Sequence, residues 1–203
     1  MVEALVKAGA DVNDTDETEG RCPLLLAAEK GAVDVTEGLL DLGADTEVGD
    51  KAGKTALSWA CERGHVDVID RLLAAGAKVN VVDAIGCTPL LAAAVKGRLD
   101  VVDRLVIQGA DINHRDKEGT SVLMMASCKG HAPVVGRLID LGCDVNLQND
   151  QGWTALTFAC CWGKVEVVKI LLAHGADPSL HEITGKTALD WTSSRVIKEL
   201  LQG

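Results

Sequence analysis

A short stretch near the end of the chain, from Gly152 to Gly163, concentrates the side chains that could do chemistry. It reads GWTALTFACCWG and holds two of the four tryptophans beside two adjacent cysteines. Indole rings can build an aromatic binding surface, thiolates can bind a metal such as zinc, and an exposed thiol can react as a nucleophile. Which of these applies depends on whether Trp153, Cys160, Cys161 and Trp162 lie in the core or on the surface.

The rest of the chain offers little for catalysis. We find no phosphate-binding loop, dinucleotide glycine motif, HExxH zinc motif or GxSxG nucleophile turn. No Cys and His pair recurs at the spacing of a zinc site. We therefore expect a protein that is not an enzyme, with no catalytic residues, no metal and no cofactor.

Composition narrows the class of protein further. The 203 residues are 47% hydrophobic and 25% charged, which is typical of a folded globular chain, and their formal net charge is −10. An acidic chain is poorly suited to nucleic acid, which requires a basic face. The sequence has no apolar run long enough for a membrane helix and no signal-peptide pattern at its start. The seven scattered cysteines indicate reduced thiols and a cytoplasmic location, with the nucleus as the alternative.

A glycine that recurs every 33 residues organises the whole chain. Each of these glycines begins a similar segment, as in GKTAL, GCTPL and GWTAL, and they stand at Gly20, Gly53, Gly86, Gly119, Gly152 and Gly185. A second glycine series keeps the same step at Gly43, Gly76, Gly109, Gly142 and Gly175. Such self-similarity indicates a stack of repeated supersecondary units.

Each unit is predicted to contain two short helices separated by turns. In one unit, Leu57 and Ala60 are spaced as on one face of a first helix, and Gly64 ends that helix. Leu72 belongs to the apolar face of a second helix, and Gly76 follows it where a left-handed C-cap is expected. The prediction is an all-α solenoid whose 33-residue helix-turn-helix units are joined by β-turn or hairpin loops.

These motifs resemble the ankyrin repeat. GCTPLLAAAVKG at 86–97 and GADIN at 109–113 match its pattern closely, and the resemblance covers nearly the whole chain. It implies one ankyrin-repeat domain over residues 1–203. The expected parts are a half repeat at 1–13, repeats that start near 17, 50, 83, 116 and 149, and a shortened C-terminal cap repeat at 182–203.

The resemblance also implies a surface for binding a partner protein or peptide. Ankyrin repeats usually make contacts through the turn around the first glycine and the exposed side of the first helix, which together line a concave groove. Carried over by position, the candidate partner-binding residues are Lys54, Glu62, Arg63, Ile85, Val95, Lys96, Lys129, Trp153 and Trp162. Cations outnumber acids among them, so we expect a non-catalytic scaffold or adaptor that binds a partner of acidic character and is itself a monomer. The alternative is that these lysines only solvate the surface.

Two other functions remain open. The chain could be a regulatory or substrate-recruiting segment of a larger enzyme or channel, and the half repeat at its start favours that possibility. The family also includes readers of methylated lysine, and that resemblance places Trp153, Phe158 and Trp191 in an aromatic cage. Cys161 stands where such a cage carries an acid, which weakens the case.

The repeat motif also suggests a modification. Asparagines at the end of the Gly-Ala-Asp-x-Asn motif can be hydroxylated in ankyrin repeats, and Asn80, Asn113 and Asn146 hold that place or its equivalent here. The structural alternative is that each asparagine hydrogen-bonds the following turn.

Overall fold

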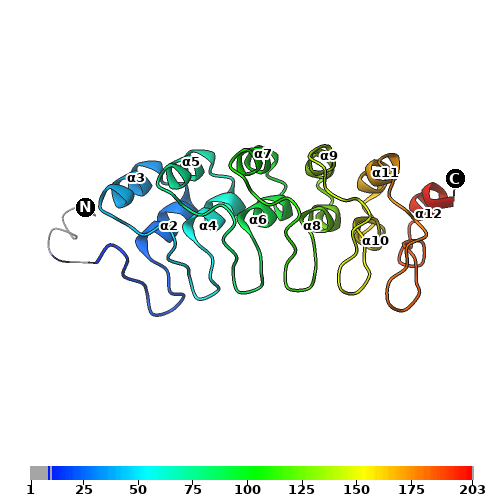
Figure 1. Ribbon diagram of the computed structural model, residues 1–203, viewed down its shortest axis with the longest axis horizontal. Helices are drawn as coiled ribbons and strands as arrows, with labels where there is room; N and C mark the ends of the chain where they lie inside the picture. Colours follow the sequence, from blue (N-terminus) through cyan, green and yellow to red (C-terminus); the bar gives the residue numbers. More distant parts are fainter. Residues whose placement is uncertain (1–8, 10, 203) are drawn as a thin grey trace. The chain divides into compact units, whose positions relative to one another are not determined.

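The protein is described by a computed structural model that covers residue 9 and residues 11–202 (Figure 1). Its contacts group the chain into two compact units. Unit 1 runs up to Ala93 and includes Asp103–Ala110, whereas unit 2 comprises Ala94–Val102 and the residues from Asp111 onward. Most of the half repeat predicted at 1–13 lies outside the described residues, and the single domain over 1–203 stays a prediction.

Unit 1 contains two complete helical pairs. Helices α2 (Pro23–Lys30) and α3 (Val33–Asp41) form the first pair, and α4 (Ala56–Arg63) and α5 (Val66–Ala74) form the second. The first helices α2 and α4 pack side by side in one layer, and the second helices α3 and α5 pack in another. Helices α6 (Pro89–Val95) and α7 (Leu99–Ile107) contribute residues to both units.

Unit 2 repeats this layered arrangement. Its first helices are α8 (Val122–Lys129) and α10 (Ala155–Cys161), and its second helices are α9 (Ala132–Asp140) and α11 (Val165–Ala173). Helix α8 packs on α10, and α9 packs on α11. The cap repeat has turns at residues 188–191 in place of a first helix, and α12 (Arg195–Gln202) packs on α11.

The predicted signals at the helix ends are present. The hydroxyl of Thr154 accepts a hydrogen bond from the backbone N–H of Thr157 at 3.1 Å and so caps the start of α10. Gly64 follows α4 with φ of 82° and returns its N–H to the carbonyl of Ala60 at 2.8 Å. Only glycine adopts this left-handed conformation at little cost, which explains why glycines mark the repeat.

Aliphatic side chains fill the interior, as the sequence predicts. Leu57 and Leu72 are completely buried in unit 1, and Leu138 and Leu156 are buried in unit 2. These leucines recur at the same places in successive repeats because each repeat buries its apolar face against its neighbours. Over the described part of the chain, the structure is all-α with isolated β-bridges at the hairpin bases, and it contains no helix that is long and apolar enough to cross a membrane.

Candidate functional site

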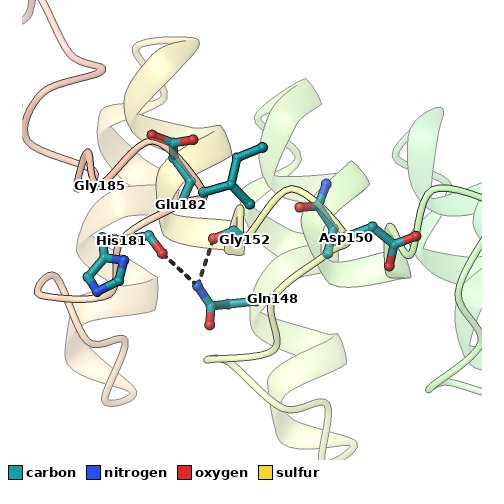
Figure 2. A pocket seen from close by; sticks show the side chains of 8 residues that line it. Gln148, Asp150, Gly152, His181, Glu182 and Gly185 are labelled. Atoms are coloured by element: carbon teal, nitrogen blue, oxygen red, sulfur yellow. Dashed lines mark hydrogen bonds between the residues drawn. The ribbon is translucent and has the colours of Figure 1, made fainter.

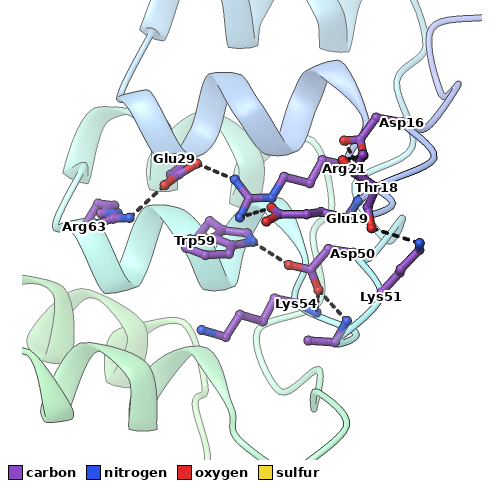
Figure 3. A network of polar contacts seen from close by, with 11 residues as sticks. Asp16, Thr18, Glu19, Arg21, Glu29, Asp50, Lys51, Lys54, Trp59 and Arg63 are labelled. Carbon is purple, nitrogen blue, oxygen red and sulfur yellow. Dashed lines mark hydrogen bonds and ion pairs between the residues drawn. The ribbon is translucent and has the colours of Figure 1, made fainter.

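Trp59 is the centre of a polar network on the outer side of α4 in unit 1 (Figure 3). Three cationic groups lie close to its indole ring. The guanidinium of Arg21 is 4.8 Å from the ring centroid, Lys54 Nζ is 4.7 Å away, and the guanidinium of Arg63 is 5.7 Å away. The indole Nε1 donates a hydrogen bond to Asp50 Oδ2 at 3.0 Å. The ring is therefore held by one hydrogen bond and covered by cations, which favour the face of an indole.

Two carboxylates, Glu29 on α2 and Glu62 on α4, form ion pairs with these cations. Glu29 accepts from Arg21 at 2.9 Å and from Arg63 at 2.7 Å, and Glu62 forms an ion pair with Lys54 at 2.8 Å. Glu29 and Glu62 each stand nine residues after a hairpin glycine, whereas Arg21 and Lys54 stand one residue after it. We call Arg21, Glu29, Lys54, Trp59, Glu62 and Arg63 the unit 1 face.

Unit 2 carries an aromatic cluster at the matching positions. Trp153 packs between Phe158 and Trp191, with ring centroids 5.0 Å and 4.7 Å apart and tilted interplanar angles of 57° and 50°. Such tilted contacts are favourable because the edge of one ring meets the face of the next. Lys186 places its Nζ 4.8 Å from the centroid of Trp191. All three rings are partly exposed, so the cluster forms part of the surface.

The two adjacent cysteines of unit 2 differ sharply in their surroundings. Cys160 is buried, and burial together with the neighbouring Cys161 thiol raises its pKa to about 12. Cys161 is exposed at the end of α10, and Trp162 beside it leaves 61% of its surface open to solvent. Among the described residues, no group of three or more His, Cys, Asp or Glu side chains could hold a metal ion. The stretch is therefore core at Cys160 and surface at Trp153, Cys161 and Trp162.

The surface side chains of unit 2 at these repeat positions are considered together. We call the following residues the unit 2 face: Lys129, Trp153, Phe158, Cys161, Trp162, Lys186 and Trp191.

A polar cleft of about 460 Å³ lies between two hairpin loops of unit 2 (Figure 2). Gln148 spans it and donates from Nε2 to the carbonyls of Gly152 at 2.8 Å and His181 at 3.0 Å. The carboxylate of Glu182 is engaged by the Thr184 hydroxyl and backbone amides, which lowers its pKa. Gln148 thus joins the two loops, whereas Glu182 is engaged within its own loop, so these polar groups already have partners.

Family comparison agrees with this architecture. The model for ankyrin repeats in three copies matches residues 1–83, 43–116, 90–182 and 123–202. The chain belongs to the ankyrin repeat family. The ankyrin fold is typically a non-catalytic module for protein–protein interaction, so the fold by itself favours binding over catalysis.

Named relatives of this ankyrin chain are proteins with ankyrin repeats and a SOCS box. It is 48% identical over 56 residues to ankyrin repeat and SOCS box protein 6 of Mus musculus and 50% identical over 56 residues to that of Homo sapiens. Each match covers 27% of this chain and 13% of the relative's length. The crystal structure of the human ASB11 ankyrin repeat domain is similar over 99% of this chain and 90% of that one, with a TM-score of 0.89 and 26% identity.

The predicted binding residues fall into separate groups. Lys54, Glu62 and Arg63 meet around Trp59, and Trp153 joins the aromatic cluster of unit 2. The other predicted residues are surface positions at turns or helix ends: Ile85, Val95, Lys96, Lys129 and Trp162. Ile85 is 68% exposed in unit 1. No ligand or partner tests their role, so binding by these residues stays a prediction.

The structure adds residues that the candidate set does not include. Trp59 and Arg21 complete the network in unit 1, and Phe158 and Trp191 complete the cluster in unit 2. Three of them could have been found from the sequence by their position in the repeat. Trp59, Phe158 and Trp191 each stand six residues after a hairpin glycine.

The proposed methyl-lysine cage is only partly matched. Trp153, Phe158 and Trp191 do meet, but Trp153 touches both other rings directly. An ammonium group could enter between these rings only after they moved apart. Methyl-lysine binding stays a prediction.

The asparagines of the repeat motif join neighbouring repeats. Asn80 Nδ2 donates to the carbonyl of Gly109 at 3.1 Å, and Asn146 Nδ2 donates to the carbonyl of Gly175 at 3.0 Å. Asn146 Oδ1 also accepts from the N–H of Asp177 at 2.8 Å. Both Nδ2 bonds reach a glycine 29 residues further along the chain, so these side chains join repeats and do not simply cap the turn that follows them. Hydroxylation of Asn80, Asn113 and Asn146 stays a prediction.

Proposed function

We propose that this protein is a non-catalytic scaffold or adaptor that binds a partner protein on the surface made by its hairpin turns and first helices. The observation that carries the proposal is the concentration of aromatic and basic side chains on that surface in both units. Tryptophan and arginine are enriched among residues that dominate binding energy, because they bury large area with few rotamers. The partner segment carries acidic residues, since cations predominate at the exposed turn and helix-end positions such as Lys96 and Lys129.

The state of the cysteines bears on where the protein works. The seven cysteines carry free thiols, which agrees with a protein that works in the reducing cytoplasm or nucleus. We also propose that it works as a monomer. Neither a bound metal nor a cofactor is part of the proposed function.

Capture from a cell lysate followed by chemical cross-linking tests the location of binding. A lysine-reactive cross-linker should join the captured protein to Lys96 or Lys129, which are exposed beside the first helices. Lys169 is an exposed control on the second helix α11. Cross-links confined to Lys169, or no protein retained above the level on heat-unfolded protein, would contradict the proposal.

A second candidate is that the array recruits substrates or regulates activity within a longer protein. The relatives support it, because their names combine ankyrin repeats with a SOCS box and the matched segments cover 13% of their length. Sequencing of full-length transcripts tests this candidate. A reading frame that continues into another domain supports it, and one confined to ankyrin repeats argues against it.

A further inference from the structure

We infer that the unit 2 face is the docking site for a peptide segment that places an aromatic or aliphatic anchor on Trp162 and acidic residues on Lys129 and the neighbouring Lys164. The unit 1 face is closed by its own ion pairs. This inference rests on the proposed function and specifies which surface binds and what chemistry it recognises.

The unit 1 face uses its charges internally. Each cation one residue after the hairpin glycine pairs with the acid nine residues after it, as Arg21 does with Glu29 and Lys54 with Glu62. Arg63 pairs with Glu29 of the preceding repeat. A partner carboxylate would have to displace an existing one, and the exchange of one ion pair for another yields little net free energy.

In unit 2, cysteines occupy the repeat position that carries a glutamate in unit 1. Cys128 and Cys161 stand nine residues after their hairpin glycines, where unit 1 has Glu29 and Glu62. Burial raises the pKa of the Cys128 thiol, so this thiol carries no charge at neutral pH. The backbone is the same, but the carboxylates that close the unit 1 face are absent here.

Two lysines near Cys128 in unit 2 are left without an ion-pair partner in the described part of the chain. Within residues 11–202, Lys129 and Lys164 form no ion pair, whereas Arg21, Lys54 and Arg63 in unit 1 all do. Lys129 ends α8, and the stem of Lys164 lies against Gly130 just beyond that end. Unpaired ammonium groups attract an acidic segment, raise its association rate and discriminate against basic segments.

The aromatic side chains of this face supply the apolar anchor site. Trp162 is 61% exposed, and it holds the position that Arg63 holds in unit 1. An exposed indole at a helix end offers a large apolar area to a partner, and the packed Trp153 cluster gives a rigid aromatic surface on the same repeat. Apolar anchoring together with positive charge defines the chemistry of the partner segment.

Selection from a random dodecapeptide display library on the immobilised full chain tests the inference. We expect enriched peptides that combine an aromatic or large aliphatic residue with Asp or Glu. Individual peptides are then titrated by fluorescence anisotropy against three variants: Trp162→Ala, Lys129→Glu and the control Lys30→Glu. Lys30 ends α2 as Lys129 ends α8, and both are exposed, so the two reversals perturb their helix ends alike.

Trp162→Ala should weaken peptide binding at least about 30-fold, the size expected for a hot-spot residue. Lys129→Glu should weaken it several-fold and reduce its salt dependence, whereas Lys30→Glu should leave it unchanged. Equal effects of the two lysine reversals, or enriched peptides without acidic residues, overturn the inference. If a lysate protein is cross-linked to the first-helix lysines but no peptide depends on Trp162, the proposed function stands and this inference fails. If neither lysate protein nor peptide is retained, both fail.

Discussion

Gly152 and Gly185 occupy the same position in successive hairpins but differ in the space around them. Both have positive φ, 81° at Gly152 and 83° at Gly185. A Cβ added at Gly152 would lie 2.8 Å from Cα of Glu182 and 3.3 Å from the backbone N of Ile183. A Cβ added at Gly185 would meet no atom within 4 Å. The two glycines therefore separate the conformational cost of an alanine from its steric cost.

Alanine at Gly185 should lower the free energy of unfolding by roughly 1–2 kcal/mol, the cost of a left-handed conformation for a residue with a Cβ. Alanine at Gly152 pays the same term and also forces apart two backbone segments, which adds about 1–3 kcal/mol by analogy with overpacked cores. Gly152→Ala should therefore be the more destabilising change by about 1–3 kcal/mol.

Urea unfolding followed by tryptophan fluorescence measures this difference. Trp153, Trp162 and Trp191 lie in unit 2 with both glycines, so the signal reports the changed unit when Trp59 of unit 1 is replaced by phenylalanine in every variant. Repeat arrays can unfold in stages, which makes a local reporter necessary. Equal loss of stability in the two variants would refute the reasoning, because it would mean that the hairpins separate freely and that the close approach at Gly152 carries no cost.

Three further predictions concern thiols, acid and methylated ligands. Brief treatment of the native protein with iodoacetamide at pH 8 should label Cys161 ahead of Cys160, whose burial and raised pKa keep it protonated, and peptide mass mapping would show the order. Hydrogen bonds from the Thr18 hydroxyl and the Glu19 amide lower the pKa of Asp16, so its stabilisation is present above the unfolded pKa of about 4 and is lost as pH falls through its folded pKa. The melting temperature of Asp16→Asn should therefore fall less steeply in acid than that of the wild type, and parallel curves would contradict this. Peptides with unmodified, mono-, di- and trimethylated lysine should give the same weak response in fluorescence titrations, because the rings around Trp153 are in contact, and a methylation-dependent affinity would show that they open.

The fold can be predicted from the sequence because the residues that determine it, the turn glycines and the buried leucines, recur at fixed spacing in every repeat. A glycine with positive φ such as Gly64 can be recognised from its spacing, and so can a leucine such as Leu57 that must be buried in every repeat. The same register correctly separates Cys160, a core position, from Trp162, a surface position. These features depend on the backbone path, which successive repeats share.

The side-chain partners on the surface cannot be predicted in the same way. Lys54 and Arg63 are correctly assigned to the outer surface, but the sequence does not show that both converge on Trp59 or that Glu29 and Glu62 neutralise them. Long side chains have many rotamers of similar energy, and the choice depends on the residues one repeat away. A count of charges therefore overstates how basic the unit 1 face is to an approaching partner.

A few surface positions on a shared backbone decide how the charged side chains of each repeat pair. An acid nine residues after the hairpin glycine, as at Glu29, draws in the cations of its own and the next repeat and closes the surface around an indole. A cysteine at that position, as at Cys128, supplies no carboxylate, and the nearby Lys129 and Lys164 form no ion pair within the described residues. The indoles differ as well, because Trp59 donates to Asp50, whereas the N–H of Trp191 is buried and has no acceptor within the described residues. Substitutions at such positions change the surface without changing the fold, which is why similarity of fold identifies the family but does not identify the partner.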